Sequence, residues 1–155
     1  MIPILVEYPV EEANPWVCYH CFRCSSGCPV ALVLRDYRPH RIVAKFRYGR
    51  GRDLIDSEII WKCTQCYKCV NYCPQGVSPA LVVELLKYLA SREGYPIPAA
   101  YLDMIRNIKE TGYAFREMEV TDREFEIHDR ESLGLDPLKP PADMDVLRRI
   151  LEGLT

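Results

Sequence analysis

Long apolar runs and histidine are scarce in this 155-residue sequence. The most apolar stretch, residues 79–90, is shorter than a membrane-spanning helix and contains Glu84 and Lys87. The N-terminal residues show no basic segment followed by an apolar core and a small-residue cleavage site, so no secretory signal is expected. We therefore expect a cytoplasmic protein with no direct membrane span.

The three histidines, His20, His40 and His128, are scattered along the chain. They belong to no Ser/His/Asp grouping, and no phosphate-binding glycine loop is present. The sequence therefore offers no catalytic residues, and we expect the chain to be non-catalytic alone. The formal net charge is only -2, which argues against nucleic acid as a partner.

Cysteine is plentiful by contrast, and all eight cysteines fall in two runs of identical spacing. The runs are Cys18-x2-Cys21-x2-Cys24-x3-Cys28-Pro29 and Cys63-x2-Cys66-x2-Cys69-x3-Cys73-Pro74. Two copies of this spacing are typical of proteins that hold two [4Fe–4S] clusters, each bound by four thiolates. Because the eight cysteines fill two such sites with none left over, electron transfer is the leading hypothesis for function.

Disulfides and structural zinc are the competing uses of clustered cysteines. Disulfides suit secreted chains, and a cytoplasmic compartment disfavours them. Structural zinc is usually bound by separated C-x2-C pairs, whereas here a third cysteine extends each pair at the same spacing. Two [4Fe–4S] clusters are therefore the predicted cofactors.

The spacing also predicts which thiolates share a cluster. Three cysteines separated by two residues each can surround one cluster, and the fourth cysteine of such a run binds the other cluster in two-cluster proteins. This rule gives two sets of ligands. The first is Cys18, Cys21, Cys24 and Cys73, and the second is Cys63, Cys66, Cys69 and Cys28. We expect His20 to lie outside both sets and the aromatic side chains Trp61, Tyr67 and Tyr72 to shield the second cluster from water.

The clearest predicted helix follows the second run. Ser78 is its expected N-cap, Pro79 occupies its first turn, and Gly94 follows its end. Its apolar face consists of Leu81, Val82, Leu85, Leu86 and Leu89.

Further helices are predicted after the first run at residues 30–36, from Pro39 to an end at Gly49-Arg50-Gly51, from Pro98 to Gly112, and over residues 143–152. Ser57 is the expected N-cap of a short turn before the second run. Strand signals are limited to residues 4–8 and 125–128.

These patterns predict a mainly α protein, an all-helical ferredoxin with two [4Fe–4S] clusters and a helical C-terminal extension. Small bacterial ferredoxins have few residues between their cysteine runs, whereas a helix-rich insert separates the two runs here. The expected organisation is an N-terminal arm (residues 1–16), a two-cluster domain (residues 17–95) and a docking extension (residues 96–155).

Both runs, read with their intervening residues, resemble those of the C subunit of heterodisulfide reductase. The first reads Cys18-Tyr-His-Cys-Phe-Arg-Cys-Ser-Ser-Gly-Cys-Pro-Val30, and the second reads Trp61-Lys-Cys-Thr-Gln-Cys-Tyr-Lys-Cys-Val-Asn-Tyr-Cys-Pro74. The tail is similar to that family as well, at Gly94-Tyr95-Pro96, Thr111-Gly112, Arg130-Glu-Ser-Leu-Gly-Leu135 and Pro140-Pro141. The resemblance covers roughly residues 15–155.

The resemblance implies an electron-transfer subunit. Its clusters would relay single electrons between an A-type subunit, which carries flavin and iron–sulfur centres, and a catalytic B-type subunit. Two alternatives stay open, namely an iron–sulfur subunit of a succinate or glycolate dehydrogenase type of oxidoreductase, and a free ferredoxin shuttle.

Charge is distributed unevenly along the chain. One stretch is basic, with Arg35, Arg38, Arg41, Lys45, Arg47, Arg50 and Arg52. Another is acidic, with Glu117, Glu119, Asp122, Glu124, Glu126, Asp129 and Glu131. Such stretches can be solvated faces, or they can orient docking on partner proteins.

Overall fold

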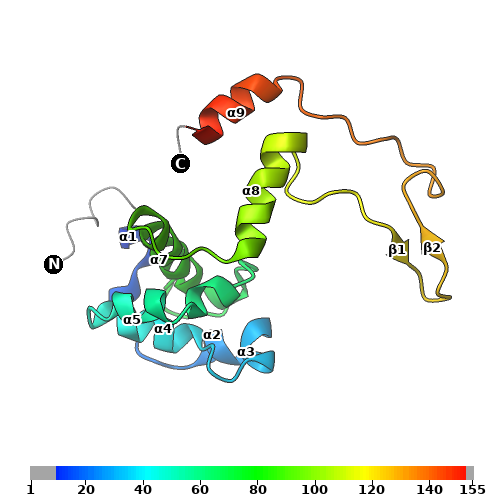
Figure 1. Cartoon of the computed structure of the whole chain (residues 1–155). Helices are drawn as coiled ribbons and strands as arrows, with labels where there is room; N and C mark the ends of the chain where they lie inside the picture. The colour runs from blue at the N-terminus through cyan, green and yellow to red at the C-terminus, as the bar shows by residue number, and fades with distance from the viewer. Residues whose placement is uncertain (1–9, 153–155) are drawn as a thin grey trace. The chain divides into compact units, whose positions relative to one another are not determined.

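The computed structural model describes residues 10–152 and divides the chain into two compact units, Met1–Pro96 and Ile97–Thr155 (Figure 1). The predicted strand at residues 4–8 lies outside the described residues. The first unit is helical throughout its described part. Its helices are α1 (Val10–Ala13), α2 (Arg23–Ser26), α3 (Pro29–Val33), α4 (Pro39–Arg47), α5 (Gly51–Asp56), α6 (Lys68–Asn71) and α7 (Pro79–Arg92), with 3-10 helices η2 (Pro15–Val17) and η3 (Ile59–Lys62).

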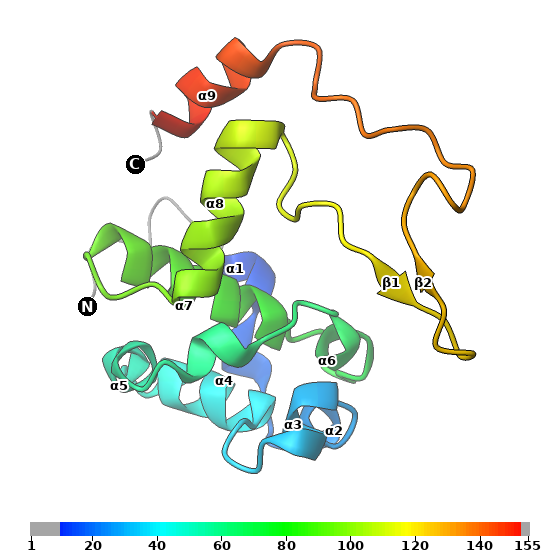
Figure 2. The ribbon, with the colours of Figure 1, turned by 45° about the vertical axis from the view of Figure 1, so that its right-hand side comes forward.

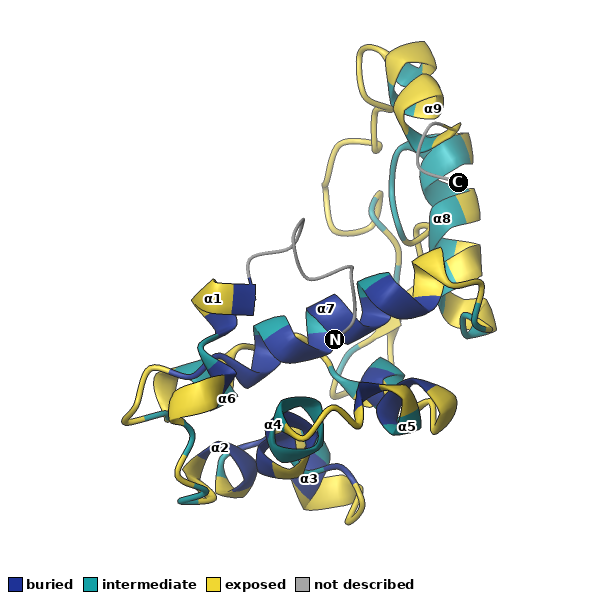
Figure 3. Cartoon of the chain, turned by 90° about the vertical axis from the view of Figure 1, so that its left-hand side faces the viewer, coloured by how far each residue is buried: buried dark blue, intermediate teal, exposed yellow. Residues whose placement is uncertain are grey.

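Helix α7 is the centre of the first unit, and α1, α4, α5, α6 and η3 all contact it (Figures 1 and 2). The predicted start is confirmed, because the Ser78 side chain accepts a hydrogen bond from the Leu81 N–H at 3.3 Å. The burial is wider than the predicted apolar face (Figure 3). Ala80, Val83, Lys87 and Ala90 are buried as well. Helix α7 therefore forms the core by packing against other elements on several sides. Each fully buried Leu or Val side chain contributes about 1.5–3 kcal/mol to the stability of the fold.

Helix α4 begins at Pro39 as predicted and buries Ile42 and Val43. Helix α5 was not predicted, because the sequence Gly49-Arg50-Gly51 was interpreted as a helix end only. Gly51 is buried at the first position of α5, and a Cβ atom there would lie 3.3 Å from Leu86 Cδ2. This glycine therefore allows α5 to approach α7 closely.

The prediction that Ser57 caps the turn before the second run is wrong. The Ser57 hydroxyl donates backward to the Leu54 carbonyl at 3.0 Å and so closes α5. The residue that begins η3 is Glu58, in the left-handed conformation with φ of 55°.

The second unit contains α8 (Ala99–Thr111), β1 (Val120–Thr121), β2 (Ile127–His128) and α9 (Met144–Glu152). The helices confirm the predictions for residues 98–112 and 143–152. The expectation of a helical C-terminal extension needs correction, because β1 and β2 form a small antiparallel sheet there that pairs Val120 with His128 and Thr121 with Ile127. Strand β2 lies within the strand signal at residues 125–128. The chain is thus mainly α, with one short hairpin in its C-terminal part.

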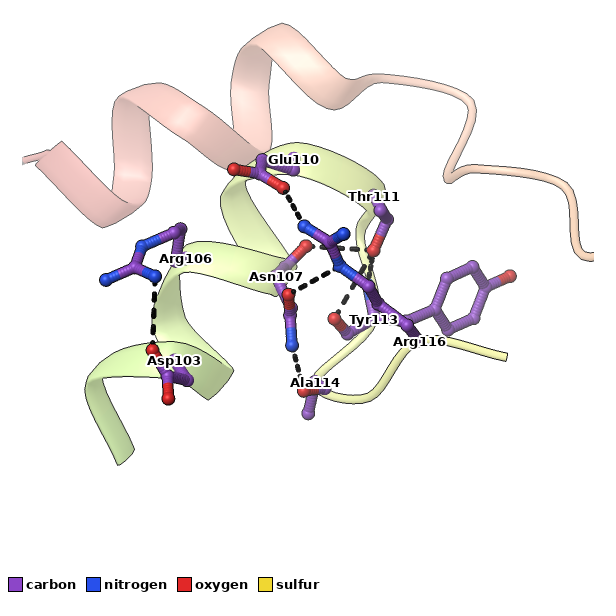
Figure 4. Close-up of polar contacts among 8 residues, drawn as sticks. All are labelled: Asp103, Arg106, Asn107, Glu110, Thr111, Tyr113, Ala114 and Arg116. Atoms are coloured by element: carbon purple, nitrogen blue, oxygen red, sulfur yellow. Dashed lines mark hydrogen bonds and ion pairs between the residues drawn. The ribbon is translucent and has the colours of Figure 1, made fainter. Parts of the chain in front are cut away.

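The C-terminal end of α8 is tied to the segment that follows it (Figure 4). Gly112 ends the helix in the left-handed conformation, with φ of 83°. Asn107 donates to the Ala114 carbonyl at 3.2 Å and accepts from Arg116 at 3.1 Å. Arg116 also reaches the Glu110 carboxylate at 2.7 Å. These contacts fix the direction in which the chain leaves α8.

Among residues 10–152, no helix combines the length and the apolar character that crossing a bilayer requires.

Candidate iron–sulfur site

The two cysteine runs repeat in backbone conformation as well as in spacing. Each run follows a 3-10 helix, η2 or η3. Cys18 then has φ and ψ of -66° and 121°, and its counterpart Cys63 has -68° and 124°. Each run continues into a one-turn helix, α2 or α6, and these two helices contact each other. The repeat in the sequence is therefore a repeat of one local structure.

Both loops hold residues in the left-handed conformation at matching positions. His20 and Gln65 precede the second cysteine of each run, with φ of 61° and 51°. Phe22 and Tyr67 directly follow the second cysteine, with φ of 66° and 56°. Left-handed backbone costs a residue other than glycine about 1–2 kcal/mol. Strain of this kind is typical of loops shaped for a bound group, whose binding energy offsets the cost.

Four cysteines from both runs line one pocket of the first unit. They are Cys18, Cys21 and Cys24 of the first run and Cys73 of the second, and we call them the first group. Phe22, His40 and Val77 line the same pocket. Cys73 reaches it because α2 and α6 lie against each other. The structure thus brings together the four residues of the first predicted ligand set.

The other four cysteines, Cys28, Cys63, Cys66 and Cys69, form the second group. Cys69 interacts electrostatically with the other three and also with Cys24 of the first group. Burial is the main reason that the pKa of Cys69 is raised to about 12, and neighbouring thiolates raise it further. The two groups therefore lie next to each other in the first unit.

The donor chemistry of both groups fits a thiolate-bound metal cluster. Burial and the nearby cysteines raise the pKa of Cys24 to about 11, although a hydrogen bond with Ser25 opposes this. Several thiolates held close together repel one another unless cations lie between them. Iron ions of a [4Fe–4S] cluster would supply that positive charge, and each cluster takes four thiolate ligands.

Hydrogen bonds reach two sulfur atoms of the first group. The Val77 N–H donates to Cys73 Sγ at 3.3 Å. The Ser25 hydroxyl is placed to donate to Cys24. The Ser25 Oγ also accepts the His40 backbone N–H at 3.2 Å and lies 2.7 Å from His40 Nδ1. Because a hydroxyl has only one proton to give, the Nδ1–H form of His40 donates to Ser25 when Ser25 donates to Cys24.

His40 is held as a neutral ring. Its pKa is lowered to about 4, first by burial and then by the positive charge of Arg41, His20 and Arg38. The Phe22 ring meets it edge to face, with centroids 4.4 Å apart. His40 therefore holds the Ser25 hydroxyl in place beside the first group. His20 lines the pocket too, as a neighbour of the four thiols.

Tyr37 lies beside the second group and is only 2% exposed. Its hydroxyl is placed to donate to Cys63, and Cys28 and Cys69 are also close. Burial first, and then these cysteines, hold the pKa of the Tyr37 hydroxyl far above its usual value. The hydroxyl therefore keeps its proton and donates it toward the Cys63 sulfur.

Each first cysteine also has a cation at its carbonyl. Arg47 donates to the Cys18 carbonyl at 2.6 Å, and Lys87 donates to the Cys63 carbonyl at 3.4 Å. Lys87 is 8% exposed, and its ammonium lies 5.6 Å from the centre of the Trp61 ring. A buried ammonium costs little only next to negative charge, which thiolates would provide.

The aromatic residues of the second run occupy different surroundings. Trp61 is partly buried against the core, whereas Tyr67 and Tyr72 are both more than two-fifths exposed. The Tyr67 hydroxyl donates to Glu84. The Tyr72 ring covers Gly27, where a Cβ atom would overlap it. Tyr72 and Gly27 hold the same place in their runs, directly before the fourth cysteine.

Sequence reasoning missed Ser25, Tyr37, His40 and Lys87 as neighbours of the cysteines. One of them carries a signal that could have been used, because Lys87 interrupts the apolar surface of α7. A lysine placed among buried leucines predicts a nearby anion. Tyr37 and His40 carry no such signal, since they reach the cysteines only through tertiary packing.

Comparison with known proteins agrees with this geometry. Residues 16–77 match the family model of the 4Fe-4S dicluster domain. This part of the chain is therefore similar to domains that hold two 4Fe-4S clusters. It is also 35% identical over 97 residues to the C subunit of the ferredoxin:CoB-CoM heterodisulfide reductase of Methanosarcina acetivorans. That match covers 61% of this chain and 38% of the relative's length. The resemblance to the C subunit of heterodisulfide reductase is confirmed.

Proposed function

We propose that this chain binds two [4Fe–4S] clusters and relays single electrons as a subunit of a heterodisulfide reductase-like complex. The first group, Cys18, Cys21, Cys24 and Cys73, holds one cluster. The second group, Cys28, Cys63, Cys66 and Cys69, holds the other. Bound clusters of this type supply one-electron oxidation and reduction. The pocket lined by cysteines of both runs is the observation on which this proposal rests.

The residues around the groups suit a relay. Cys24 and Cys69 belong to different groups yet interact electrostatically, so an electron has only a short distance to cross. Ser25, Tyr37 and the Val77 N–H donate toward cysteine sulfur atoms, which favours extra negative charge there. No candidate catalytic group accompanies them in the sequence, so substrate chemistry belongs to other chains.

The relative is named as the C subunit of a heterodisulfide reductase, which supports a role beside other subunits. An A-type subunit with flavin and iron–sulfur centres would exchange electrons with one group, and a catalytic B-type subunit with the other. Residues 17–95 would form the two-cluster domain, and residues 96–155 the extension that docks on these partners. Purification of the tagged chain from its native cells should recover both subunits, and recovery without either one contradicts this assignment.

Ligand replacement tests the shared binding of the clusters. Cys28→Ala and Cys69→Ala should abolish the same electron paramagnetic resonance signal, because both residues belong to the second group. Cys73→Ala and Cys24→Ala should abolish the other signal. The wild-type chain should bind eight irons after anaerobic reconstitution, at four per cluster. Thr64→Ala, at an exposed position inside the second run, is the matched control.

The ligand assignment is decided by which variants abolish the same electron paramagnetic resonance signal. If Cys28→Ala removes the signal that Cys24→Ala removes, the ligands do not cross between the runs. A wild-type chain that takes up only about four irons overturns the two-cluster proposal.

A further inference from the structure

The hairpin of β1 and β2 is built around one side chain, Asp122. Its Oδ1 atom accepts the backbone N–H groups of Glu124 and Glu126 at 3.0 and 2.8 Å. Its Oδ2 atom lies 2.8 Å from His128 Nε2. The Asp122 N–H donates to the Glu126 carbonyl at 3.0 Å. The loop between the strands thus has a defined conformation.

This loop presents Phe125 to solvent. Phe125 has φ of 65°, in the left-handed region where glycine is favoured, and its N–H donates to the Asp122 carbonyl at 3.2 Å. Its side chain is 86% exposed, more than any other large hydrophobic side chain of the described residues. A bulky residue in this conformation is uncommon. The fold therefore bears two costs at one position, a strained backbone and an aromatic ring in water.

Two further apolar side chains are exposed on the strands, one on each face of the hairpin, because Val120 pairs with His128 and Ile127 with Thr121. Val120 is 51% exposed and Ile127 is 66% exposed, on the two paired strands. Carboxylates surround them, at Glu117, Glu119, Asp122, Glu124, Glu126, Asp129 and Glu131. Arg123 and Arg130 are the only arginines in this stretch, and it contains no lysine. The hairpin therefore presents one exposed aromatic ring at its tip, within a segment rich in carboxylates.

We propose that this hairpin is a docking element, in which Phe125 inserts into an apolar pocket bordered by Lys and Arg on a partner subunit. Complementary charge would orient the approach, and the buried ring would hold the contact. The bonds of Asp122 fix the loop beforehand, so little conformational freedom is lost on binding. The inference rests on the proposed function, because it identifies the chemistry of the surface that receives this subunit.

Site-specific cross-linking in the native complex tests the contact. A photoreactive phenylalanine analogue, p-benzoyl-L-phenylalanine, replaces Phe125 in the full-length chain. We expect a cross-link to one partner subunit, at a peptide that contains apolar residues and Lys or Arg. The same analogue at Phe115, which is 63% exposed outside the hairpin, is the matched control. Cross-links only within the chain, for instance to the basic stretch around Arg41, or only to a second copy, overturn the proposal.

Replacement of Phe125 separates docking from folding. Phe125→Gly removes the ring and relieves the left-handed backbone, so the hairpin should persist while partner affinity falls by on the order of tenfold or more. Phe125→Tyr should retain most of the affinity. Unchanged partner affinity of Phe125→Gly, with the hairpin intact by NMR, contradicts the inference.

The charged part of the proposal has its own readout. The double variant Glu124→Gln and Glu126→Gln should weaken binding at low salt and reduce the dependence of affinity on salt. Iron content and cluster reduction should equal those of the wild type in every hairpin variant. Failure of the docking inference is thus distinguishable from failure of the electron-transfer proposal, which would appear as a loss of clusters.

Discussion

The two cysteine groups differ in the donors that reach their sulfur atoms. In the first group the donors are a backbone N–H, that of Val77, and the hydroxyl of Ser25, which His40 supports. In the second group the donor is the buried hydroxyl of Tyr37. Val82 stands as far after Cys73 as Tyr37 stands after Cys28, and its side chain has no hydrogen-bond donor. Because hydrogen bonds to sulfur stabilise the reduced state, such differences give two chemically similar clusters different potentials.

Tyr37→Phe tests this effect at a single atom. Loss of the hydroxyl should lower the reduction potential of the cluster at the second group and leave the other cluster nearly unchanged. The variant should also lose about 1 kcal/mol of stability, the typical net contribution of one hydrogen bond. Redox titration followed by electron paramagnetic resonance measures both potentials. Tyr48→Phe, at a residue 74% exposed, is the control. Equal shifts at both clusters would contradict the contact with Cys63.

Much of the structure around individual residues can be predicted from the sequence, because it depends on local geometry. The cysteine spacing predicts the grouping of Cys73 with the first run. Three cysteines at this spacing form a loop around one cluster, and the fourth cysteine of a run is expected to bind the other cluster. Ser78 as an N-cap follows from similar local rules. Tyr37 and His40 were not accessible, since their contacts with the cysteine groups arise only after α2, α4 and η3 have packed.

The elements of the chain show where local rules fail. Helices α4, α7 and α8 begin and end near the predicted residues because proline, serine and glycine mark their ends. Helix α5 was missed because its first residue is a glycine, and glycine is selected there by the approach to Leu86. Glu58, and not Ser57, is the N-cap of η3. It adopts a left-handed backbone conformation that no side-chain preference predicts. Strand β1 was missed because the hairpin depends on side-chain bonds of Asp122.

The hairpin should therefore depend on the ionisation of Asp122. Its pKa is lowered by hydrogen bonds from His128, Glu126 and Glu124. A carboxyl group with a lowered pKa stabilises the structure above its unfolded pKa of about 3.9, and this stability is lost as the pH falls through the native pKa. We expect Asp122→Ala to open the loop at neutral pH, and the wild-type hairpin to open only in acid.

Amide exchange of Glu124 and Glu126 in the full-length chain measures this opening. Their protection should fall to that of an open loop in Asp122→Ala, and the amides of α7 should be unaffected. Asp136→Ala, a change at a nearby exposed acid, serves as the control. Protection that survives in Asp122→Ala would show that backbone pairing alone holds the hairpin.

At the scale of the whole molecule, the buried core belongs to the first unit. The buried hydrophobic cluster runs from Val10 to Ala90, and partly buried Tyr95 packs against it. In the described part of the second unit, no hydrophobic side chain is fully buried. The second unit thus forms no buried core comparable to that of the first unit. Its apolar side chains are available for contacts with other proteins.

Deletion of residues 97–155 tests this division. We expect the remaining chain to fold and to bind as many irons as the full-length chain, because all eight cysteines and the core lie before the deletion. The proposed partners should no longer co-purify with it. Iron analysis, visible absorption and affinity purification give the three readouts. A shortened chain that is insoluble or poor in iron would show that the second unit is needed for the fold.

The pocket shared by Cys24 and Cys73 has a consequence for biosynthesis. The N-terminal run leaves the ribosome with only three of the four thiols of its site, and the fourth follows after α4 and α5 have been synthesised. If the two groups bind the clusters as proposed, neither run can be loaded separately during translation. Under the proposed ligand assignment, metal insertion waits until both runs have met, and the open thiols of the first run stay vulnerable to oxygen until then.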